Sequence, residues 1–310
     1  MNRELPTHPS GHQHVIRHGD QRAVVVQVGG GLREYEVDGF SVVDGYGVDE
    51  MAAHGRGQVL APWPNRLADG RYELGDQTFQ LPISEPPAHN AIHGLVRWSG
   101  WDRLDATASS VRMGHVLWPQ PGYPFTLGLE QRYELSDAGL RVTMHAENVG
   151  RRAAPYGAGM HPYVRAELGL IDASVLRLPA DGWLETDERH IPTGRRLGVE
   201  GTAYDFRQPR ALGATAMDVA FTGLSRGADG LAWTELRSDR DGRCVAVWVD
   251  SRFDYLMVFT GNPLSEGERR RSLAVEPMTC APDAFRSGLG LVLLQPGQRL
   301  SASWGISVSR

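Results

Sequence analysis

Short apolar runs separated by turn signals recur along the whole chain, and this pattern constrains the fold more than any other feature. The pair Asp38-Gly39 stands between the strand-like residues 32–37 and 40–43, and such a pair between two β-type runs is a strong hairpin signal. Strand-like runs also flank turns at residues 75–76, 136–139 and 239–242. Many short strands joined by tight turns predict a sandwich or a barrel.

Glycine and proline support this interpretation, because 37 Gly and 19 Pro interrupt the chain and favour short strands over long helices. Short helical turns are expected only near residues 49–54 and 280–285. All-β domains often run long without splitting, and no linker or change of composition marks a boundary. We therefore expect an all-β fold, a single large antiparallel β-sandwich over residues 23–310, preceded by a polar segment at residues 1–22.

Charge and cysteine content limit the partners. The net charge is -5, so the basic face that nucleic-acid binding needs is not expected. The chain contains neither a run of about 18 apolar residues nor the apolar core of a signal peptide. Cys244 and Cys280 are too few for a disulfide scaffold, so free buried thiols are expected, although the sequence also permits one bridge. We expect a cytoplasmic monomer or homodimer with no nucleic-acid or membrane partner.

A carboxylate at the end of an apolar run is the first candidate for chemistry. Residues 273–275 lead directly into Glu276, and Pro277 follows at once. Because proline fixes φ and removes a donor, the backbone around Glu276 has few options. Glutamate rarely occupies a strand interior unless it is paired or used. The alternative is a glutamate on an edge strand that faces water.

The turn at residues 62–64 presents two further polar side chains, Asn65 and Arg66, on a stiff Pro-Trp-Pro loop. A guanidinium offers a planar fork of donors that suits hydroxyls or carboxylates. The alternative is an arginine that fastens the loop to a neighbouring acid.

Two histidines and an aspartate lie on similarly constrained backbone. Pro162 biases His161 away from helix, and a histidine held this way can act as a general acid or base near neutral pH. His93 precedes Gly94, where the chain can bend sharply, although a lone histidine is commonly a structural residue. Asp218 opens a short apolar run, and its alternative is a turn or cap aspartate.

Several common catalytic motifs are missing from the sequence. There is no GxGxxG after a strand, no GxxxxGK[ST] and no CxxC. The candidate side chains are therefore glutamate, histidine, arginine and aspartate on an all-β frame that also holds 8 Trp and 9 Tyr. Aromatic faces stack on sugar rings and planar charged groups bind ring hydroxyls, so this combination indicates a carbohydrate ligand.

Taken together, these stretches resemble the aldose 1-epimerase (galactose mutarotase) family, from about Ala23 to Val308. The resemblance rests on six signals in order: Asn65-Arg66 followed by a hairpin at 69–82, Ile92-His93-Gly94, His161-Pro162-Tyr163, Asp218, Val275-Glu276-Pro277 and Pro282-Asp283-Ala284. Galactose-type members are expected to carry Asn-His-x-Tyr-Phe around the second histidine and a glycine pair after the first. This chain has MHPY at 160–163 and Gly94-Leu95, so it resembles a divergent bacterial branch, and its sugar is left unassigned.

The resemblance implies a β-sandwich that interconverts the α and β anomers of an aldohexose or related sugar. Glu276 would take the proton of the anomeric hydroxyl, and His161 would protonate the ring oxygen. Opposite charges sustain each other, so Glu276 is expected to be ionised and His161 protonated at rest. No metal or organic cofactor is needed. The substrate-binding residues that the resemblance implies are Asn65, Arg66, His93, Tyr163 and Asp218.

Three alternatives stay open. A non-catalytic carbohydrate-binding sandwich would need no acid–base pair. A glycoside hydrolase would use Glu276 and Asp218 as its two carboxylates. An epimerase of an anionic, phosphorylated or sulfonated sugar would need a further cation, for which Arg97 is the first candidate, against a surface or structural role for that residue.

Overall fold

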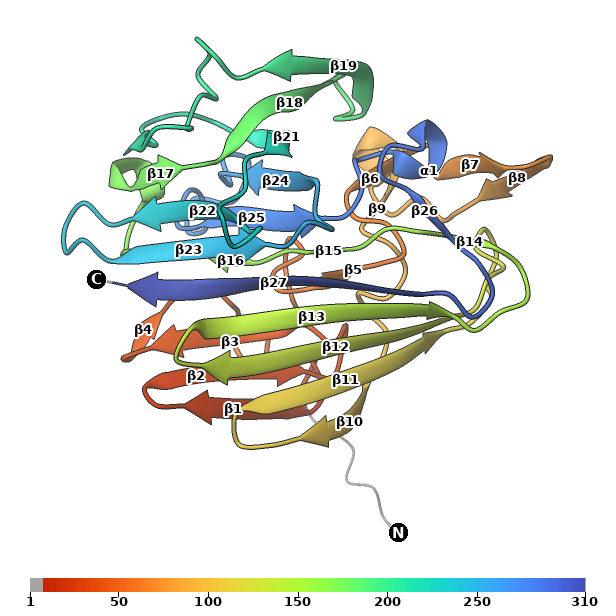
Figure 1. The fold of residues 1–310 in the computed structure, drawn as a ribbon, viewed down its shortest axis with the longest axis horizontal. Helices are drawn as coiled ribbons and strands as arrows, with labels where there is room; N and C mark the ends of the chain where they lie inside the picture. Colours follow the sequence, from red (N-terminus) through yellow and green to blue (C-terminus); the bar gives the residue numbers. More distant parts are fainter. Residues whose placement is uncertain (1–7, 310) are drawn as a thin grey trace.

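Strands make up nearly all of the regular structure in the computed structural model, which describes residues 8–309. Two large antiparallel sheets carry most of the chain (Figure 1). The nine-stranded sheet has the order β10 (Asp102–Ala106), β11 (Ser110–Leu117), β12 (Leu127–Ser136), β13 (Gly139–Asn148), β27 (Arg299–Ser309), β23 (Cys244–Val249), β22 (Ala232–Arg237), β17 (Val175–Arg177) and β20 (Arg210–Ala211). The eight-stranded sheet has the order β19 (Pro192–Gly198), β18 (Ala180–Thr186), β21 (Asp218–Leu224), β24 (Tyr255–Phe259), β25 (Leu273–Met278), β15 (Gly159–Met160) and β5 (Val59–Leu60), with β16 (Tyr163–Val164) also paired to β25.

Smaller sheets complete the frame. A four-stranded sheet has the order β1 (Gln13–His18), β2 (Gln21–Val26), β3 (Leu32–Val37) and β4 (Phe40–Ser41). Three two-stranded sheets pair β6 (Arg66–Ala68) with β9 (Asn90–Ile92), β7 (Arg71–Leu74) with β8 (Gln77–Gln80), and β14 (Ala154–Tyr156) with β26 (Val292–Leu294). The predicted all-β sandwich is therefore confirmed.

One large cluster of buried apolar side chains joins the sheets, and it includes Val25 of β2, Tyr133 of β12 and Phe221 of β21. Along β12 and β13 buried and more exposed positions alternate, because successive side chains of a strand point to opposite faces. β23 and β25 are instead buried at every position, so both of their faces are covered. Glu276 thus lies inside a buried strand between β24 and β15, and the edge-strand alternative is wrong.

The hairpins expected from turn chemistry are present. Asp38 and Gly39 both adopt positive φ, 51° and 71°, between β3 and β4, as a two-residue hairpin turn requires. β12 and β13 pair from Ser136 opposite Gly139, and β22 and β23 pair around the turn at residues 239–242. Local turn signals therefore set the register of these strands.

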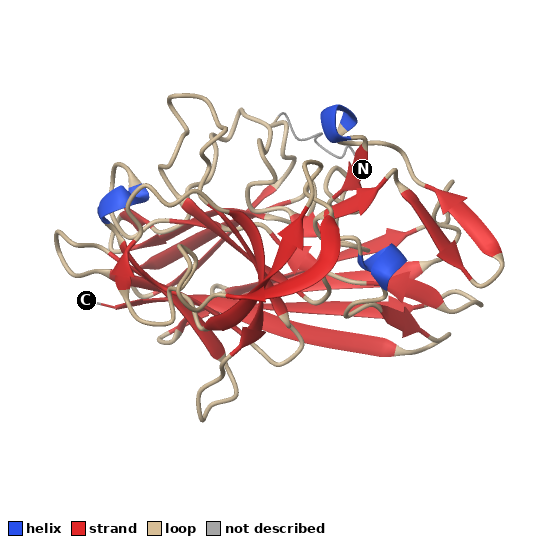
Figure 2. Ribbon diagram, turned by 90° about the horizontal axis from the view of Figure 1, so that it is seen from above, coloured by secondary structure: helices blue, strands red, loops and turns tan. Residues whose placement is uncertain are grey.

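Other expectations need adjustment. Residues 49–54 form turns and bends instead of a helical turn, whereas α1 (Ala284–Ser287) lies close to the expected position. Two 3-10 turns, at Pro86–Ala88 and Ile171–Ala173, were not expected. Figure 2 shows the short helical pieces in blue among the more extensive strands. Residues 13–18, assigned from the sequence to the polar segment 1–22, form β1 and pair with β2, and their buried Ile16 belongs to the core.

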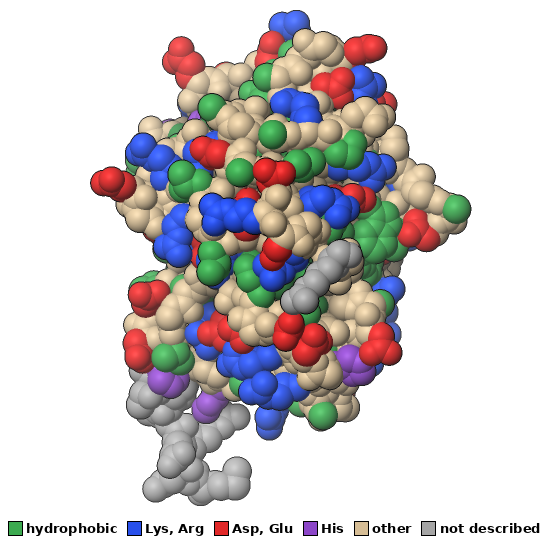
Figure 3. All heavy atoms as spheres, turned by 90° about the vertical axis from the view of Figure 1, so that its left-hand side faces the viewer, with side chains coloured by type: hydrophobic (Ala, Val, Ile, Leu, Met, Phe, Trp, Pro, Cys, Tyr) green, Lys and Arg blue, Asp and Glu red, His purple; other side chains and the backbone are tan. Residues whose placement is uncertain are grey.

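The expectation of free thiols is confirmed, because Cys244 and Cys280 are both buried and unbridged. Acidic and basic side chains are interspersed on the face drawn in Figure 3. Within residues 8–309, no helix has the length and apolar character needed to cross a membrane.

Candidate active site

A cavity of about 310 Å³ gathers the site residues that the sequence singles out. Its walls come from the β5–β9 region on one side and from β16, β21, β24 and β25 on the other. The predicted residues that line it are Asn65, Arg66, His93, His161, Tyr163, Asp218 and Glu276. Residues far apart in the chain thus share one open cavity of the size that small ligands use.

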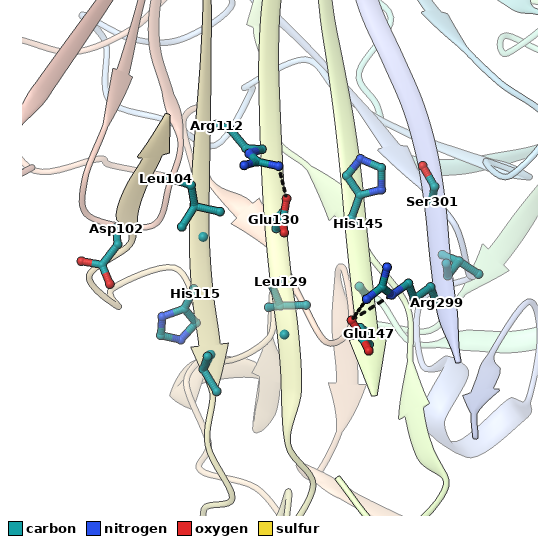
Figure 4. A pocket seen from close by; sticks show the side chains of 15 residues that line it. Asp102, Leu104, Arg112, His115, Leu129, Glu130, His145, Glu147, Arg299 and Ser301 are labelled. Atoms are coloured by element: carbon teal, nitrogen blue, oxygen red, sulfur yellow. Dashed lines mark hydrogen bonds and ion pairs between the residues drawn. The ribbon is translucent and has the colours of Figure 1, made fainter. Parts of the chain in front are cut away.

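A larger hollow, about 630 Å³, lies on the solvent-facing side of β10–β13 and β27 (Figure 4). Its charged side chains neutralise one another: Arg112 lies 3.6 Å from Glu130, and Arg299 lies 2.9 Å from Glu147. These four side chains are all at least partly exposed. This hollow therefore lacks a fully buried acid in contact with a fully buried histidine, which the smaller cavity has.

Glu276 lies in the middle of β25, opposite Met257 of β24, and only 2% of its surface is exposed. Its Oε1 lies 3.3 Å from Nε2 of His161, and its Oε2 has no hydrogen-bond partner among the described residues. A buried carboxylate oxygen without a partner is costly, so this atom is available to a ligand donor.

His161 lies between β15 and β16 and is held on two sides. Its ring stacks on Tyr163 with a centroid distance of 4.9 Å and an interplanar angle of 12°. Gly55 packs against the ring so closely that a Cβ there would lie 2.6 Å from Cδ2 of His161. The imidazole therefore has little freedom to move away from Glu276.

Burial sets the protonation of this pair. Desolvation, aided by Asp218, raises the pKa of Glu276 well above its usual range, although Arg66 opposes the shift. Desolvation, aided by Arg97, lowers the pKa of His161 to about 3. Both directions favour the neutral forms, contrary to the expectation of an ionised Glu276 and a protonated His161. The physical reason is that removing two charges from water costs more than their mutual attraction returns.

His93 follows β9 with a positive φ of 63°, and burial lowers its pKa well below the usual range. Its Nδ1 accepts the backbone N–H of Asn65 at 3.2 Å. A neutral imidazole that accepts at Nδ1 carries its proton at Nε2, so His93 is a fixed hydrogen-bond donor.

This tautomer also decides whether the site fits a metal ion. His93, His161 and Glu276 bring ligand-type atoms within 4.8 Å of one another. The Nδ1 lone pair of His93 is already engaged by Asn65, and its Nε2 carries a proton. Since metal ligation needs a free imidazole lone pair, these three residues do not fit a cation in the arrangement observed.

Arg66 connects the two walls of the cavity. Its Nε donates to both carboxylate oxygens of Glu85, at 3.1 and 3.0 Å, and its Nη1 lies 3.4 Å from Oδ2 of Asp218. The alternative of an arginine fastened to neighbouring acids therefore describes its contacts, yet the side chain also lines the cavity. Asn65 adopts φ 55° and accepts the N–H of Arg66 at 2.9 Å, so its amide shapes the turn.

Sequence reasoning missed several lining residues, namely His54, Ser84, Glu85, Trp98, Phe259 and Leu264. Nothing in the sequence distinguished Glu85 from an ordinary surface acid before two prolines. Arg97, weighed only as an alternative, does line the cavity. Its Nη1 and Nη2 lie 3.4 and 3.5 Å from neutral oxygens of Gln58 and Ile92, and burial lowers its pKa.

Comparison with known proteins supports the resemblance seen in the sequence. A family model described as aldose 1-epimerase matches residues 12–307. The chain is 37% identical over 292 residues to an uncharacterized protein, YihR, of Escherichia coli (strain K12), covering 94% of this chain and 91% of that one. It is 28% identical over 261 residues to the maltose epimerase of Levilactobacillus brevis (78% and 76%), and 27% identical over 236 residues to the galactose mutarotase of Mus musculus (71% and 66%).

Solved structures show the same fold. A GalM/aldose epimerase homologue from C. elegans superposes with a TM-score of 0.85 at 17% identity, covering 96% of this chain and 99% of that one. A galactose mutarotase-like protein from Clostridium acetobutylicum superposes with a TM-score of 0.84 at 19% identity, covering 99% and 98%.

Proposed function

This chain belongs to the aldose 1-epimerase family, and from that premise we propose that it interconverts the α and β anomers of an aldose by acid–base-catalysed opening and closing of the sugar ring. The observation that carries the proposal is the contact of 3.3 Å between Glu276 and His161, two buried side chains that line one cavity. The anomeric hydroxyl and the ring oxygen are bonded to the same carbon. One acid and one base that touch each other can therefore reach both oxygens at once.

The pair holds one exchangeable proton, whichever residue carries it. A neutral acid beside a neutral imidazole and a carboxylate beside an imidazolium differ only in the place of that proton. Hydroxyls of a bound sugar can hydrogen-bond to both partners and thereby favour the charged form, which burial disfavours. The catalytic state then needs no proton from solvent.

The reaction follows from that state. Glu276 takes the proton of the anomeric hydroxyl while His161 gives its proton to the ring oxygen. The bond between the anomeric carbon and the ring oxygen breaks, and a carbonyl group forms. Rotation of the aldehyde presents its other face, and the two residues reverse their roles as the ring closes.

The other lining residues would hold the sugar. His93 offers an N–H donor, Arg66 offers donors that its two acids leave free, and Asp218 offers a carboxylate oxygen. Tyr163 supports the ring of His161 through stacking and donates its hydroxyl to the His54 carbonyl at 3.0 Å.

NMR exchange spectroscopy between anomers, over a panel of neutral and anionic aldoses, tests the proposal. Glu276→Gln and His161→Asn should each lower the exchange rate by roughly 10²–10⁴-fold while circular dichroism shows the fold intact. His145→Asn, in the larger hollow, is the matched control and should keep the wild-type rate. Full rate in either test variant would remove that residue from the mechanism. If the wild-type protein accelerates exchange of no aldose, the non-catalytic binding module becomes the better account.

A second candidate, an epimerase of an anionic sugar, is favoured by Arg97. The other guanidinium that lines the cavity, that of Arg66, is matched by two carboxylates, whereas no described carboxylate lies within ion-pair distance of Arg97. A part-buried guanidinium without a counter-ion is a suitable partner for a phosphate or sulfonate group. The anionic members of the aldose panel decide between the two candidates.

A further inference from the structure

We infer that His190 is a positioning residue for the carboxylate of Asp218. The turn that carries His190 places its imidazole beside this carboxylate, and Arg189 fastens the turn to the opposite wall of the cavity. The inference rests on the proposed function, because it assigns a part in sugar binding to a residue outside the cavity lining.

The turn itself is rigid. Residues 187–191 join β18 to β19, and Oδ1 of Asp187 accepts the backbone N–H groups of Arg189 and Ile191, both at 2.9 Å. His190 adopts a positive φ of 60°, a conformation that non-glycine residues seldom occupy. The hydrogen bonds of Asp187 maintain this backbone, which directs the imidazole toward Asp218.

Arg189 docks the turn onto the segment between β6 and β9. Its Nε donates to the Ala88 carbonyl at 2.9 Å, and its Nη2 donates at 2.9 Å to the Asp69 carboxylate and the His89 carbonyl. The buried amide of Asn90 donates back to the Arg189 carbonyl at 3.1 Å. A guanidinium satisfied at several fixed acceptors holds its chain in one place, so the turn from the eight-stranded sheet is tied to the wall that carries Arg66.

Side chains from both walls of the cavity contact the same oxygen atom of Asp218. Oδ2 of Asp218 lies 3.4 Å from Nη1 of Arg66 and 3.4 Å from Nδ1 of His190. No described residue donates a hydrogen bond to Oδ1 of the same carboxylate. The hydrogen bond from Arg66 and the ion-pair contact with His190 on one oxygen restrict the rotation of the carboxylate, so that its other oxygen is left for a sugar hydroxyl in the cavity that Asp218 lines.

Nδ1 of His190 lies at ion-pair distance from Oδ2 of Asp218 without forming a hydrogen bond to it, so the contact is one of charge and position. Removal of the imidazole should weaken sugar binding equally in the ground and transition states, because a hydroxyl remote from the anomeric carbon is held in both. Such a loss raises KM and leaves kcat nearly unchanged.

Initial-rate polarimetry on the best aldose for the wild-type protein tests the inference. His190→Ala should raise KM by about fivefold to tenfold with kcat within about twofold, and His190→Asn, which retains a donor, should recover most of the affinity. When Asp218→Asn is already present, adding His190→Ala should raise KM no further. His18→Asn is the matched control, because His18 is also a partly exposed histidine paired with an aspartate, Asp137, at 2.8 Å, but lies outside the cavity lining.

An unchanged KM in His190→Ala, or an equal rise in His18→Asn, would overturn the inference while the proposed function stands. If the wild-type protein acts on no aldose, the proposed function fails instead. The crystal structure of His190→Ala then decides: the inference expects the Asp218 carboxylate to rotate, and an unmoved carboxylate overturns it.

Discussion

Replacement of Gly55 by alanine tests the role of His161 without touching its side chain. Gly55 has a φ of +77°, and a Cβ there would lie 2.6 Å from Cδ2 and 3.1 Å from Nε2 of His161. Carbon atoms in contact prefer about 3.5–4.0 Å, so the ring must move by about 1 Å. Tyr163 stacks on the ring with a centroid distance of 4.9 Å, so it must shift together with the imidazole.

A movement of this size separates the acid and the base of the proposed mechanism. Nε2 of His161 now lies 3.3 Å from Glu276, and a misplacement of about 1 Å at a catalytic group can cost about 10²-fold in rate. We therefore expect kcat/KM of Gly55→Ala to fall by about 10²-fold. The left-handed backbone should also lower the free energy of unfolding by about 1–2 kcal/mol, which leaves the fold largely populated.

The assay is anomer exchange by NMR, normalised to the folded fraction from urea unfolding. Gly201→Ala is the matched control, because Gly201 has a similar φ of +71° and nothing lies within 4 Å of the added Cβ. Both variants should lose comparable stability, and only Gly55→Ala should lose activity. Equal rates per folded molecule in the two variants would show that the position of His161 does not limit the reaction.

Three further predictions follow from other contacts. Arg97→Gln should lower kcat/KM for an anionic aldose by about tenfold or more, and it should change kcat/KM for the neutral counterpart by less than about twofold. Polarimetry measures both values, and equal losses of kcat/KM would mean that Arg97 has a structural role. Because the folded-state pKa of His161 is about 3 and its ordinary value is 6.5, its burial contributes stability above pH 6.5 that is lost as pH falls toward 3. His161→Asn should therefore lose less Tm than the wild type between pH 6.5 and 4 in calorimetry, and parallel curves would contradict the assignment. Finally, a Cβ on Gly157 would lie 2.2 Å from Sγ of Cys280, so Gly157→Ala should lower the free energy of unfolding by about 1–3 kcal/mol. Adding Cys280→Ala should restore part of that free energy in urea unfolding. If the effects of the two substitutions on the free energy of unfolding simply add, the clash is refuted.

The hairpins could be predicted because their determinants are local. Asp38 and Gly39 have the side chains that positive φ requires, and the alternation along β12 and β13 needs only the two faces of a strand. The helical turn expected at residues 49–54 is absent, since no cap or apolar periodicity supports one there. β1 was missed because its polar residues resemble a tail, and only its pairing with β2 makes it a strand.

The site divides in the same way. Glu276 and His161 were found because proline constrains each backbone, which a reader of the sequence can see. The sequence could not identify Glu85, His190 or the guanidinium of Arg97 that lacks a counter-ion. Whether a side chain has a partner depends on which residues lie near it in the folded protein. The protonation of Glu276 and His161 was predicted wrongly for the same reason.

The sequence alone determined which segments are strands, where they turn, and which rigid backbone positions carry an acid and an imidazole, since propensity, turn chemistry and proline act over a few residues. Tertiary structure decided that these groups share one cavity, that burial makes the pair neutral, and that two walls meet at Asp218. Contact and desolvation depend on distance through space, and no local pattern of residues encodes that distance.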